Sequence, residues 1–415
     1  MARAQILGLD VGSSSIKAVI AEPAGDGKLA LVKGFSRPAK GVRKGAVVDM
    51  DGLVGVISSI FDDVSEVSKS ALKNIYFNVN SADATVRISH GSTAVSRASS
   101  EIYKDDMVRA IEASVAPRPR SNKMNLHVLD REYIVDGVGD IQDPRGMVGA
   151  KLEVINLIVE VFEPSVRNLE KCIKMAGGAV GGMVFSPLAS AKSVLTDNQL
   201  ELGVVLIDIG GSTTGLAVYE EGKLLHTRVF KVGANYITND LALALEIPPD
   251  LAEKIKISHG YALAKEVPSR ENIDLKKFDS DVSRTPSKRF VAEVIEARLS
   301  EICEVVNDEL KSIGKERSLP GGVVVVGGGA KMPGVADLVQ RELRMATQIG
   351  AANGAMFTAK DASVRELIES PEFTCALGLP LYSDEAKGRA SGGTSIVVQS
   401  SIRKIFGKIL EVFRP

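Results

Sequence analysis

The sequence has no Trp, only 5% aromatic residues and only four His among its 415 residues. Few aromatic side chains argue against a base-stacking platform for nucleic acids and against an aromatic cage for a cationic ligand. The dispersed His residues argue against a metal enzyme. The three cysteines, Cys172, Cys303 and Cys375, are far apart and form no CxxC pair. We therefore expect neither a disulfide framework nor a zinc cluster, and a reducing cytosol as the compartment.

Long apolar runs and an excess of either charge are also missing. The longest apolar stretches, residues 154–162 and 321–330, are too short to span a bilayer. Asp10 interrupts the first apolar run, so a secretory signal is not expected. Lys and Arg number 51 against 52 Asp and Glu, which argues against a nucleic-acid binder steered by positive charge. The 45% hydrophobic content is typical of a soluble chain with roughly two to four folded units.

The sequence contains an internal repeat. Residues 6–15 (ILGLDVGSSS) and 204–213 (VVLIDIGGST) each form an apolar run with an Asp, followed by a turn rich in Gly, Ser and Thr. Each copy continues with a second apolar run and a hairpin turn, at Gly27 and at Gly222. The repeat predicts a chain built from two related α/β halves.

A third glycine-rich segment, residues 321–330, precedes a helical pattern at 335–343. This order of buried strand, turn and helix is typical of a mostly parallel sheet. The periodicity predicts other helices at 53–68, 104–116, 164–176, 186–195, 234–246, 250–259 and 287–313. It predicts other strands at 72–80, 84–91, 126–136, 150–162 and 226–232. Residues 385–395 lack periodicity, which predicts a flexible linker before a terminal helix.

The two repeated turns have the composition of a phosphate-binding site. Short turns rich in Gly, Ser and Thr let backbone N–H groups converge on phosphate oxygens. Asp10 and Asp208 precede the turns and could hold a hydrated Mg²⁺ against the phosphates, and Lys17 could reach a β- or γ-phosphate. Alone, either turn is more typical of a tight hairpin with structural glycines. Two copies with the Asp at the same place favour a nucleotide site.

These turns, together with residues 253–256 (EKIK) and 327–330 (GGGA), resemble the phosphate-1, phosphate-2 and adenosine motifs of the actin and heat-shock chaperone superfamily. Within it, residues 186–190 (SPLAS), 233–240 (GANYITND) and 256–260 (KISHG) closely resemble the FtsA family of bacterial cell-division proteins. The likeness runs from Ile6 to about Tyr382 and resumes at the C-terminal helix. The motifs are specific in combination and weak singly.

The resemblance implies an α/β, actin-like, two-lobed fold of duplicated RNase H-like domains, with an FtsA-type inserted subdomain and a C-terminal amphipathic helix. It implies the following parts of the chain: lobe I core (1A) at 1–83, 164–201 and 361–384; an inserted interaction subdomain (1C) at 84–163; lobe II core (2A) at 202–253 and 319–360; subdomain 2B at 254–318; a flexible linker at 385–397; and a membrane-targeting amphipathic helix at 398–415.

The resemblance also implies ATP and Mg²⁺ in the cleft between the lobes, with Asp10 and Asp208 holding the metal through water. The residues implied to contact the nucleotide are Gly12, Ser13, Ser14, Ser15 and Lys17 from one lobe, Gly210, Gly211, Ser212 and Thr213 from the other, Asn235 at a helix start that faces the phosphates, Glu253 and Lys256 at ribose and adenine, and Gly327, Gly328, Gly329 and Ala330 beside the nucleoside. Without the flanking motifs, the Glu253 and Lys256 pair would be typical of a solvated helix face.

Fast hydrolysis is not expected. Chaperone and filament relatives place a Glu or Gln near the Pro-x-Ala segment to orient the attacking water. This chain has Ser186 before Pro187, with no carboxylate adjacent. Its second turn has Ser212 where the commoner motif has a third Gly, and Gly215 where an Asp often follows. We expect a nucleotide switch that is at most a slow ATPase, and no catalytic residue is assigned.

The C-terminal segment forms an amphipathic pattern. On a helical wheel, its bulky apolar side chains gather on one face, opposite four basic residues and one acidic residue. This is typical of a helix that lies in an anionic membrane interface. The residues assigned to the membrane are Ile402, Arg403, Lys404, Ile405, Phe406, Lys408, Ile409, Leu410 and Phe413. The alternative is a helix docked on the protein's own core or on a partner. Polymerisation would couple many such weak membrane contacts by avidity.

Two regions are assigned to partners by the resemblance alone. The inserted subdomain serves filament contacts with other copies of the chain and contacts with later division proteins. Subdomain 2B binds the acidic C-terminal tail of the tubulin-like division protein FtsZ, for which the basic residues Lys288, Arg289 and Arg298 are the candidates. The alternative for any one of them is an ordinary solvated face.

The leading hypothesis is an ATP-binding, polymerising scaffold that tethers FtsZ filaments to the cytoplasmic membrane and helps assemble the division septum. It places the chain at the cytoplasmic face of the cell membrane, peripherally, at the division site, with no nucleic-acid partner. One alternative is a pilus assembly ATP-binding protein like PilM, which shares the turns. Another is a small-molecule kinase of the same fold, which would need an Asp base at a substrate hydroxyl. We find no extra carboxylate motif of that kind.

Overall fold

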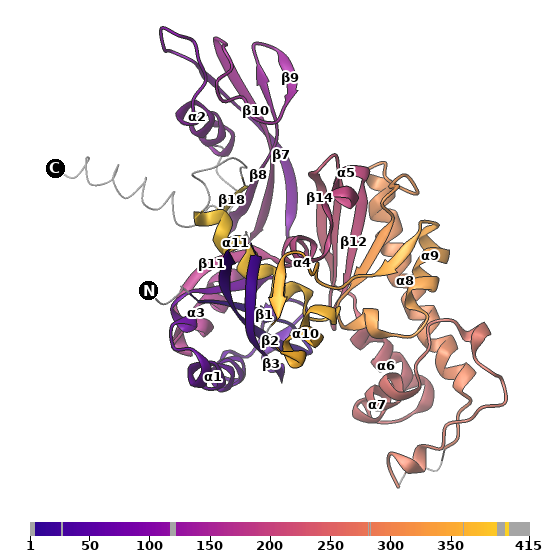
Figure 1. Cartoon of the computed structure of the whole chain (residues 1–415). Coiled ribbons are helices and arrows are strands. Elements are labelled where there is room, and N and C mark those ends of the chain that lie inside the picture. Colours follow the sequence, from indigo (N-terminus) through magenta and orange to yellow (C-terminus); the bar gives the residue numbers. More distant parts are fainter. Residues whose placement is uncertain are drawn as a thin grey trace.

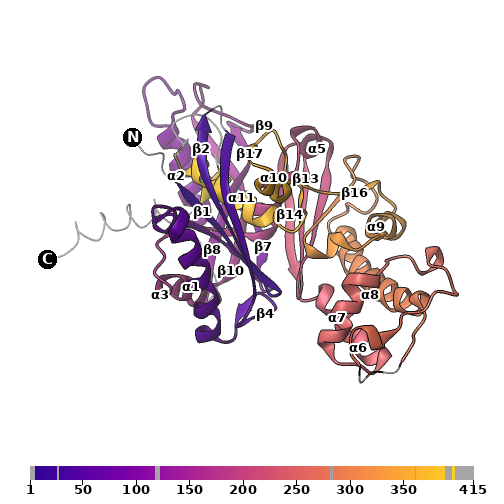
Figure 2. The ribbon, with the colours of Figure 1, turned by 60° about the horizontal axis from the view of Figure 1, so that its bottom comes forward.

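The computed structural model describes residues 5–25, 28–116, 122–280, 282, 284–359, 361–387 and 395–397. Two α/β lobes lie side by side, and a third sheet rises from the first lobe (Figure 1). Figure 2 shows the same two lobes after rotation, with α6 (Ala234–Leu245), α7 (Pro249–His259) and α8 (Lys288–Ser312) of the second lobe gathered at one end. The two-lobed α/β arrangement predicted from the repeat is confirmed.

Lobe I is built on a six-stranded sheet of order β11-β6-β1-β2-β3-β17. Its strands are β1 (Ile6–Val11), β2 (Ser15–Gly25), β3 (Lys28–Pro38), β6 (Ile75–Val79), β11 (Val180–Phe185) and β17 (Phe357–Ala359). Its helices are α1 (Met50–Val67), α3 (Glu163–Met175), α4 (Ser186–Val194), α10 (Ala362–Glu369) and α11 (Thr374–Lys387). β1 pairs antiparallel with β2 and parallel with β6, so the repeated hairpin lies inside a mixed sheet.

Lobe II repeats this core on a five-stranded sheet of order β14-β13-β12-β15-β16. Its strands are β12 (Val204–Ile209), β13 (Thr214–Glu220), β14 (Lys223–Phe230), β15 (Val323–Val326) and β16 (Thr347–Ile349). Its helices are α5 (Asp197–Leu202), α6 (Ala234–Leu245), α7 (Pro249–His259), α8 (Lys288–Ser312) and α9 (Val335–Leu343). The two copies also share their register, because Asp10 pairs with Lys17 as Asp208 pairs with Gly215.

The inserted subdomain is a sheet with one covering helix. Its elements are β7 (Thr85–Ala94), α2 (Lys104–Val115), β8 (Lys123–Val135), β9 (Val138–Ile141) and β10 (Lys151–Phe162). Alternate residues of β10 face opposite sides, as a strand requires. Val154 and Ile158 pack with α2, whereas Leu157 and Val159 join the core of lobe I. The insertion is therefore seated on lobe I by its own apolar face.

Short elements complete the chain. They are a hairpin of β4 (Val42–Arg43) and β5 (Ala46–Val47), the 3₁₀ turns η1 (Ala71–Lys73), η2 (Ala264–Glu266), η3 (Leu275–Lys277) and η4 (Gly328–Lys331), and strand β18 (Ser395–Val397), which pairs antiparallel with β8. None of the described helices is both long enough and apolar enough to cross a membrane.

Three boundaries differ from those expected. Helix α5 is bonded to the β13–β14 turn of lobe II through the N–H groups of Glu221 and Gly222, although the segment 164–201 is expected in lobe I. β17, at residues 357–359, pairs with β3 of lobe I, although the segment 319–360 is expected in lobe II. The chain thus re-enters lobe I before residue 361, where the boundary is expected, because β3 has an open edge with which β17 can pair. Within the expected linker 385–397, α11 continues to Lys387 and residues 395–397 form β18 on the edge of β8. The expected membrane helix 398–415 and the linker residues 388–394 lie outside the described residues.

Helix α11 packs so tightly against α4 that one position must be glycine. A Cβ on Gly378 would lie 1.8 Å from the carbonyl oxygen of Ala189. Gly55 in α1 is also helical, but a Cβ there meets nothing within 4 Å. Substitutions at these two glycines therefore distinguish the effect of close packing, at Gly378, from the effect of helix propensity, at Gly55.

We predict that Gly378→Ala lowers stability by about 1–3 kcal/mol or more, because the methyl group overpacks the α4–α11 contact. Gly55→Ala should instead raise it by about 0.5–1 kcal/mol, because Ala is the better helix former. Apparent melting temperatures of the two variants test this directly. A gain in melting temperature for both would contradict the packing described here.

Candidate functional site

The two repeated turns meet where the two lobes face each other. The backbone N–H of Ser212 donates to Ser13 Oγ at 2.9 Å, and Ser14 Oγ donates to Asn235 Oδ1 at 3.1 Å. A Cβ on Gly211 would lie 2.0 Å from Ser14 Oγ, so only glycine allows this approach. Residues that are almost two hundred positions apart are thus brought face to face.

Two buried carboxylates lie behind the turns. Asp10 Oδ1 accepts from Asn78 Nδ2 at 2.7 Å, and Asp208 Oδ2 accepts from Ser190 Oγ at 2.8 Å. Burial raises the pKa of Asp10 to about 6; Lys17 opposes the increase and the charge of Asp208 adds to it. Burial also raises the pKa of Asp208, against its bond from Ser190 and the charge of Lys17. The two acids therefore share one electrostatic site.

Lys17 is the cation of this site. Its side chain is buried, and Nζ donates to Ser15 Oγ at 2.7 Å and lies 5.8 Å from the ring centre of Phe373. One lysine cannot neutralise two ionised carboxylates. The site is consequently suited to an additional divalent cation.

The described residues contain no cluster of three His, Cys, Asp or Glu that could hold a metal ion alone. Two carboxylates and a lysine next to glycine-rich turns fit a hydrated Mg²⁺ that shares its oxygens with a polyphosphate. Such a group would supply charge neutralisation of the phosphates. The donor set thus fits Mg²⁺ with a nucleotide better than a free metal.

The predicted ribose and adenine residues form a network in lobe II. Lys256 Nζ lies 2.6 Å from Glu253 Oε2 and donates to Thr238 Oγ1 at 2.8 Å. The hydroxyl of Thr238 also donates to Glu253. The Lys256 side chain is buried, whereas that of Glu253 is 41% exposed. The network positions both side chains between α6 and α7.

The glycine-rich turn after β15 lies against β12. A Cβ on Gly327, where φ is 87°, would lie 2.4 Å from Asp208 Oδ1, and one on Gly329 would lie 2.3 Å from Ile209 Cγ2. A Cβ on Gly328 meets nothing within 4 Å. Gly327 and Gly329 are therefore required by packing beside the carboxylate, and Gly328 faces open space.

The start of α6 holds the second turn in shape. The backbone N–H groups of Ala234 and Asn235 donate to the carbonyl oxygens of Gly210 and Gly211 at 2.9 and 2.7 Å. A Cβ on Gly233 would lie 2.6 Å from the Gly210 oxygen. These two amides are therefore used within the protein, and Asn235 adds its side chain to Ser14.

Sequence analysis missed several groups at the site. Asn78 donates to both Asp10 and Ser186, and Asn80 Nδ2 donates to Thr213 Oγ1 at 2.8 Å. Cys375 forms a hydrogen bond with Asp10, and burial raises the pKa of its thiol well above the usual value. Asn78 and Asn80, at the end of the apolar segment 75–79, are the one sequence signal that could have pointed to these groups of the site. At the position before Pro187, Ser186 supplies a hydroxyl and no carboxylate.

The basic residues assigned to partners are engaged within the chain. Arg298 binds Asp240 of α6 through Nε and Nη2 at 2.6 and 2.9 Å, and Arg289 donates to the carbonyl oxygen of Val267. Lys288 lies 2.5 Å from Glu271. Two arginines thus stabilise lobe II rather than forming a free basic surface. The residues that bind Arg289 and Arg298 are too distant in sequence for these contacts to be predicted from it.

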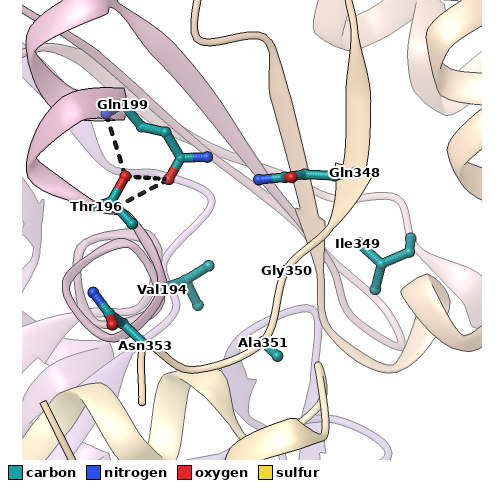
Figure 3. A pocket seen from close by; sticks show the side chains of 8 residues that line it. All are labelled: Val194, Thr196, Gln199, Gln348, Ile349, Gly350, Ala351 and Asn353. Atoms are coloured by element: carbon teal, nitrogen blue, oxygen red, sulfur yellow. Dashed lines mark hydrogen bonds between the residues drawn. The ribbon is translucent and has the colours of Figure 1, made fainter. Parts of the chain in front are cut away.

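An open pocket of about 450 Å³ lies beside the segments that connect the lobes, away from the predicted nucleotide residues. It is lined by the two chain segments that connect the lobes, with Val194, Thr196 and Gln199 from one and Gln348, Ile349, Gly350, Ala351 and Asn353 from the other (Figure 3). The segments are tied together by the bond from the Asn353 N–H to the Ser193 oxygen at 2.7 Å.

We predict that Asp10→Asn stabilises the nucleotide-free, magnesium-free protein at pH 7.5. The folded-state pKa of about 6 exceeds the reference value of 3.8, so the folded state holds the proton more tightly. The cost of ionising Asp10 therefore grows as pH rises from about 4 to about 6 and is complete above that. The gain should be at most about 3 kcal/mol at pH 7.5.

Melting curves of wild type and Asp10→Asn at pH 7.5 and pH 5.0 measure this gain, which should shrink at the lower pH. Asp83→Asn removes a half-exposed carboxylate that pairs with Lys231 and serves as the control. A gain that is independent of pH would contradict the raised pKa of Asp10.

Comparisons with known proteins agree with this architecture. The family model "Cell division protein FtsA" matches residues 205–378, and "SHS2 domain inserted in FTSA" matches residues 83–160. The expected FtsA-type inserted subdomain is thereby confirmed. The FtsA proteins of Pseudomonas aeruginosa and Bacillus subtilis are 32% and 33% identical to this chain. The alignments cover 95% and 83% of this chain, and 92% and 78% of those proteins.

Solved structures with the same fold are more distant in sequence. The PilM–PilN type IV pilus biogenesis complex matches with a TM-score of 0.64 at 17% identity, covering 92% of this chain and 98% of that one. MreB5 of Spiroplasma citri bound to AMPPNP matches with a TM-score of 0.55 at 16% identity, covering 94% and 98%. These likenesses show the actin-like fold. Over nearly its whole length, the chain belongs to the FtsA family of cell division proteins.

Proposed function

We propose that this protein binds ATP with Mg²⁺ between its lobes and acts as a polymerising scaffold that tethers FtsZ filaments to the cytoplasmic membrane. The observation that carries the nucleotide proposal is the buried pair Asp10 and Asp208 with Lys17, placed behind two facing glycine-rich turns. The membership in the FtsA family carries the division role.

Each group of the cleft has a proposed part. Asp10 and Asp208 hold the hydrated Mg²⁺, and Lys17 neutralises phosphate charge. The turns at 12–15 and 210–213 surround the phosphates with N–H and hydroxyl donors. Glu253 and Lys256 contact ribose and adenine. MreB5, which has the same fold, has been solved with ADP and with AMPPNP, which supports a nucleotide in this cleft.

Turnover is proposed to be slow. Orienting a water molecule for attack on a phosphate requires a polar group that can accept its proton or direct it. Chaperone and filament relatives place such a group near the position of Ser186. Here the Ser186 hydroxyl accepts a hydrogen bond from Asn78 and carries no charge. The scaffold therefore responds to nucleotide occupancy more than to rapid hydrolysis.

Asp208→Asn should weaken Mg²⁺-dependent ATP binding at least tenfold, because it removes half of the carboxylate pair that holds the metal. Calorimetric titration with ATP, with and without Mg²⁺, measures the effect. The control Asp197→Asn removes an exposed carboxylate at the start of α5 and should bind as wild type. Equal affinity of Asp208→Asn and wild type would refute the proposed site.

The partner surface is proposed near the start of α8. Burial is the main cause that lowers the pKa of His259, and the positive charges of Lys288 and Lys277 lower it further. Both lysines therefore place positive charge near this ring. An acidic tail such as that of FtsZ would pair with these lysines. Arg289 and Arg298 support the region through their bonds to Val267 and Asp240, so alanine substitutions there would disturb the fold as well.

Co-sedimentation with vesicles that contain anionic lipid tests the tether in one experiment. The full chain should pellet with vesicles and bring FtsZ down, whereas a chain truncated before residue 398 should stay in the supernatant, because the proposed membrane helix is lost. Lys277→Ala with Lys288→Ala should pellet normally but recruit several-fold less FtsZ.

The matched control removes Lys171 and Lys174 from α3 of the other lobe, which keeps the charge change the same. Pelleting of the truncated chain would rule out the helix at 398–415 as the membrane contact. Recruitment of FtsZ that is unaffected by the α8 variant but reduced by the control would remove Lys277 and Lys288 from the partner surface.

A further inference from the structure

Ser212 is the residue at which the second turn departs from the commoner glycine motif, and the structure gives its hydroxyl a partner in the other lobe. The backbone N–H of Lys44 donates to Ser212 Oγ at 3.0 Å. The N–H of Ser212 itself donates to Ser13 Oγ at 2.9 Å. A single residue of lobe II is therefore bonded to two separate segments of lobe I, and it is buried.

The segment that carries Lys44 is the β4–β5 hairpin, residues 42–47, and its shape is fixed. Lys44 has a φ of 49° and Gly45 a φ of 77°, both in the left-handed region. A Cβ on Gly45 would lie 1.7 Å from the carbonyl oxygen of Asn80. Asn80 in turn donates to Thr213, the neighbour of Ser212. The hairpin tip and Asn80 thus form one surface of lobe I against the second turn.

The side chain of Lys44 extends this contact to α6. Its Nζ lies 5.6 Å from the ring centre of Tyr236, a distance suited to a cation–π interaction. Arg298 also lies over this ring, at 5.7 Å, and is itself fixed by Asp240. The hairpin therefore touches lobe II at the turn and at the helix that shapes the turn.

We propose that Ser212 and the 42–47 hairpin form a latch between the lobes, which holds the cleft closed and limits the rate of nucleotide exchange. The proposal rests on the proposed nucleotide site, since the latch closes over the turns that would surround the phosphates. A ligand between two lobes can leave only when they separate. Each opening must break the bond from Lys44 to Ser212.

The exchange test uses a fluorescent ATP analogue with Mg²⁺ in a stopped-flow instrument. Ser212→Gly restores the commoner motif and deletes the hydroxyl, and Gly45→Ala displaces the hairpin from Asn80 without touching the turn. Loss of a hydrogen bond of ordinary strength should raise the association rate constant about three- to tenfold in both variants. Gly45→Ala, which leaves every proposed nucleotide contact in place, should raise the dissociation rate constant by the same factor, with Kd nearly unchanged. The double variant should add little to either single one, because both break the same contact.

The alternative is that Ser212 acts only as a phosphate donor. Dissociation alone would then accelerate, Kd would rise, and Gly45→Ala would bind as wild type. That pattern would overturn the latch. Asp83→Asn removes the half-exposed pair with Lys231 between the lobes and is the control, which should exchange nucleotide at the wild-type rate. An equal acceleration by this control would also overturn the latch.

A nucleotide-free measurement separates the latch from the proposed function. Hydrogen exchange of the hairpin peptide, read by mass spectrometry without nucleotide, should be faster by about three- to tenfold at the Lys44 amide in Ser212→Gly. Peptides from α1 should exchange as in wild type. Unchanged exchange at the hairpin would refute the latch even if ATP binds. Faster exchange in a protein that binds no ATP would sustain the latch and refute the nucleotide site.

Discussion

The structure depends on two carboxylates buried in one cleft with a single lysine between them. Burial raises the pKa of both Asp10 and Asp208, so the ionised pair is held at a cost in the free protein. Any ligand that neutralises them stabilises the closed arrangement by mass action. The proposed nucleotide and Mg²⁺ would therefore relieve an electrostatic cost that the free protein carries between its lobes.

The duplicated hairpins serve this cleft in different ways. Register places Lys17 opposite Asp10, but Gly215 opposite Asp208. A Cβ on Gly215 would lie 3.0 Å from Pro187 of α4, so the second copy gives up a charged side chain to let a helix approach. One copy supplies the cation and the other supplies the packing. The asymmetry explains how a repeat of sequence produces a single site rather than two.

Local sequence patterns predict most of the helices and strands. The helix and the bonds that they do not predict depend on contacts between segments that are distant in sequence. The helix 335–343 and the two turns were predicted from periodicity and composition. Helix α11 was not, because Gly378 and Pro380 are poor helix formers, yet they allow contact with Ala189 and with Gly8. Long-range bonds, such as that of Arg298 to Asp240, depend on tertiary structure and leave no signal in the sequence.

Helix α4 is where the cleft, helix α11 and the inserted subdomain meet. Its Ser190 donates to Asp208, and its Ser193 donates to the Thr374 oxygen of α11. The residue before α4, Phe185, donates its N–H to His127 of the insertion at 2.9 Å. Burial lowers the pKa of His127 to about 4, so at neutral pH the ring is uncharged and can accept this bond. Ser190 and Ser193 of α4, together with the preceding Phe185, therefore connect Asp208, α11 and the insertion through one short segment of the chain.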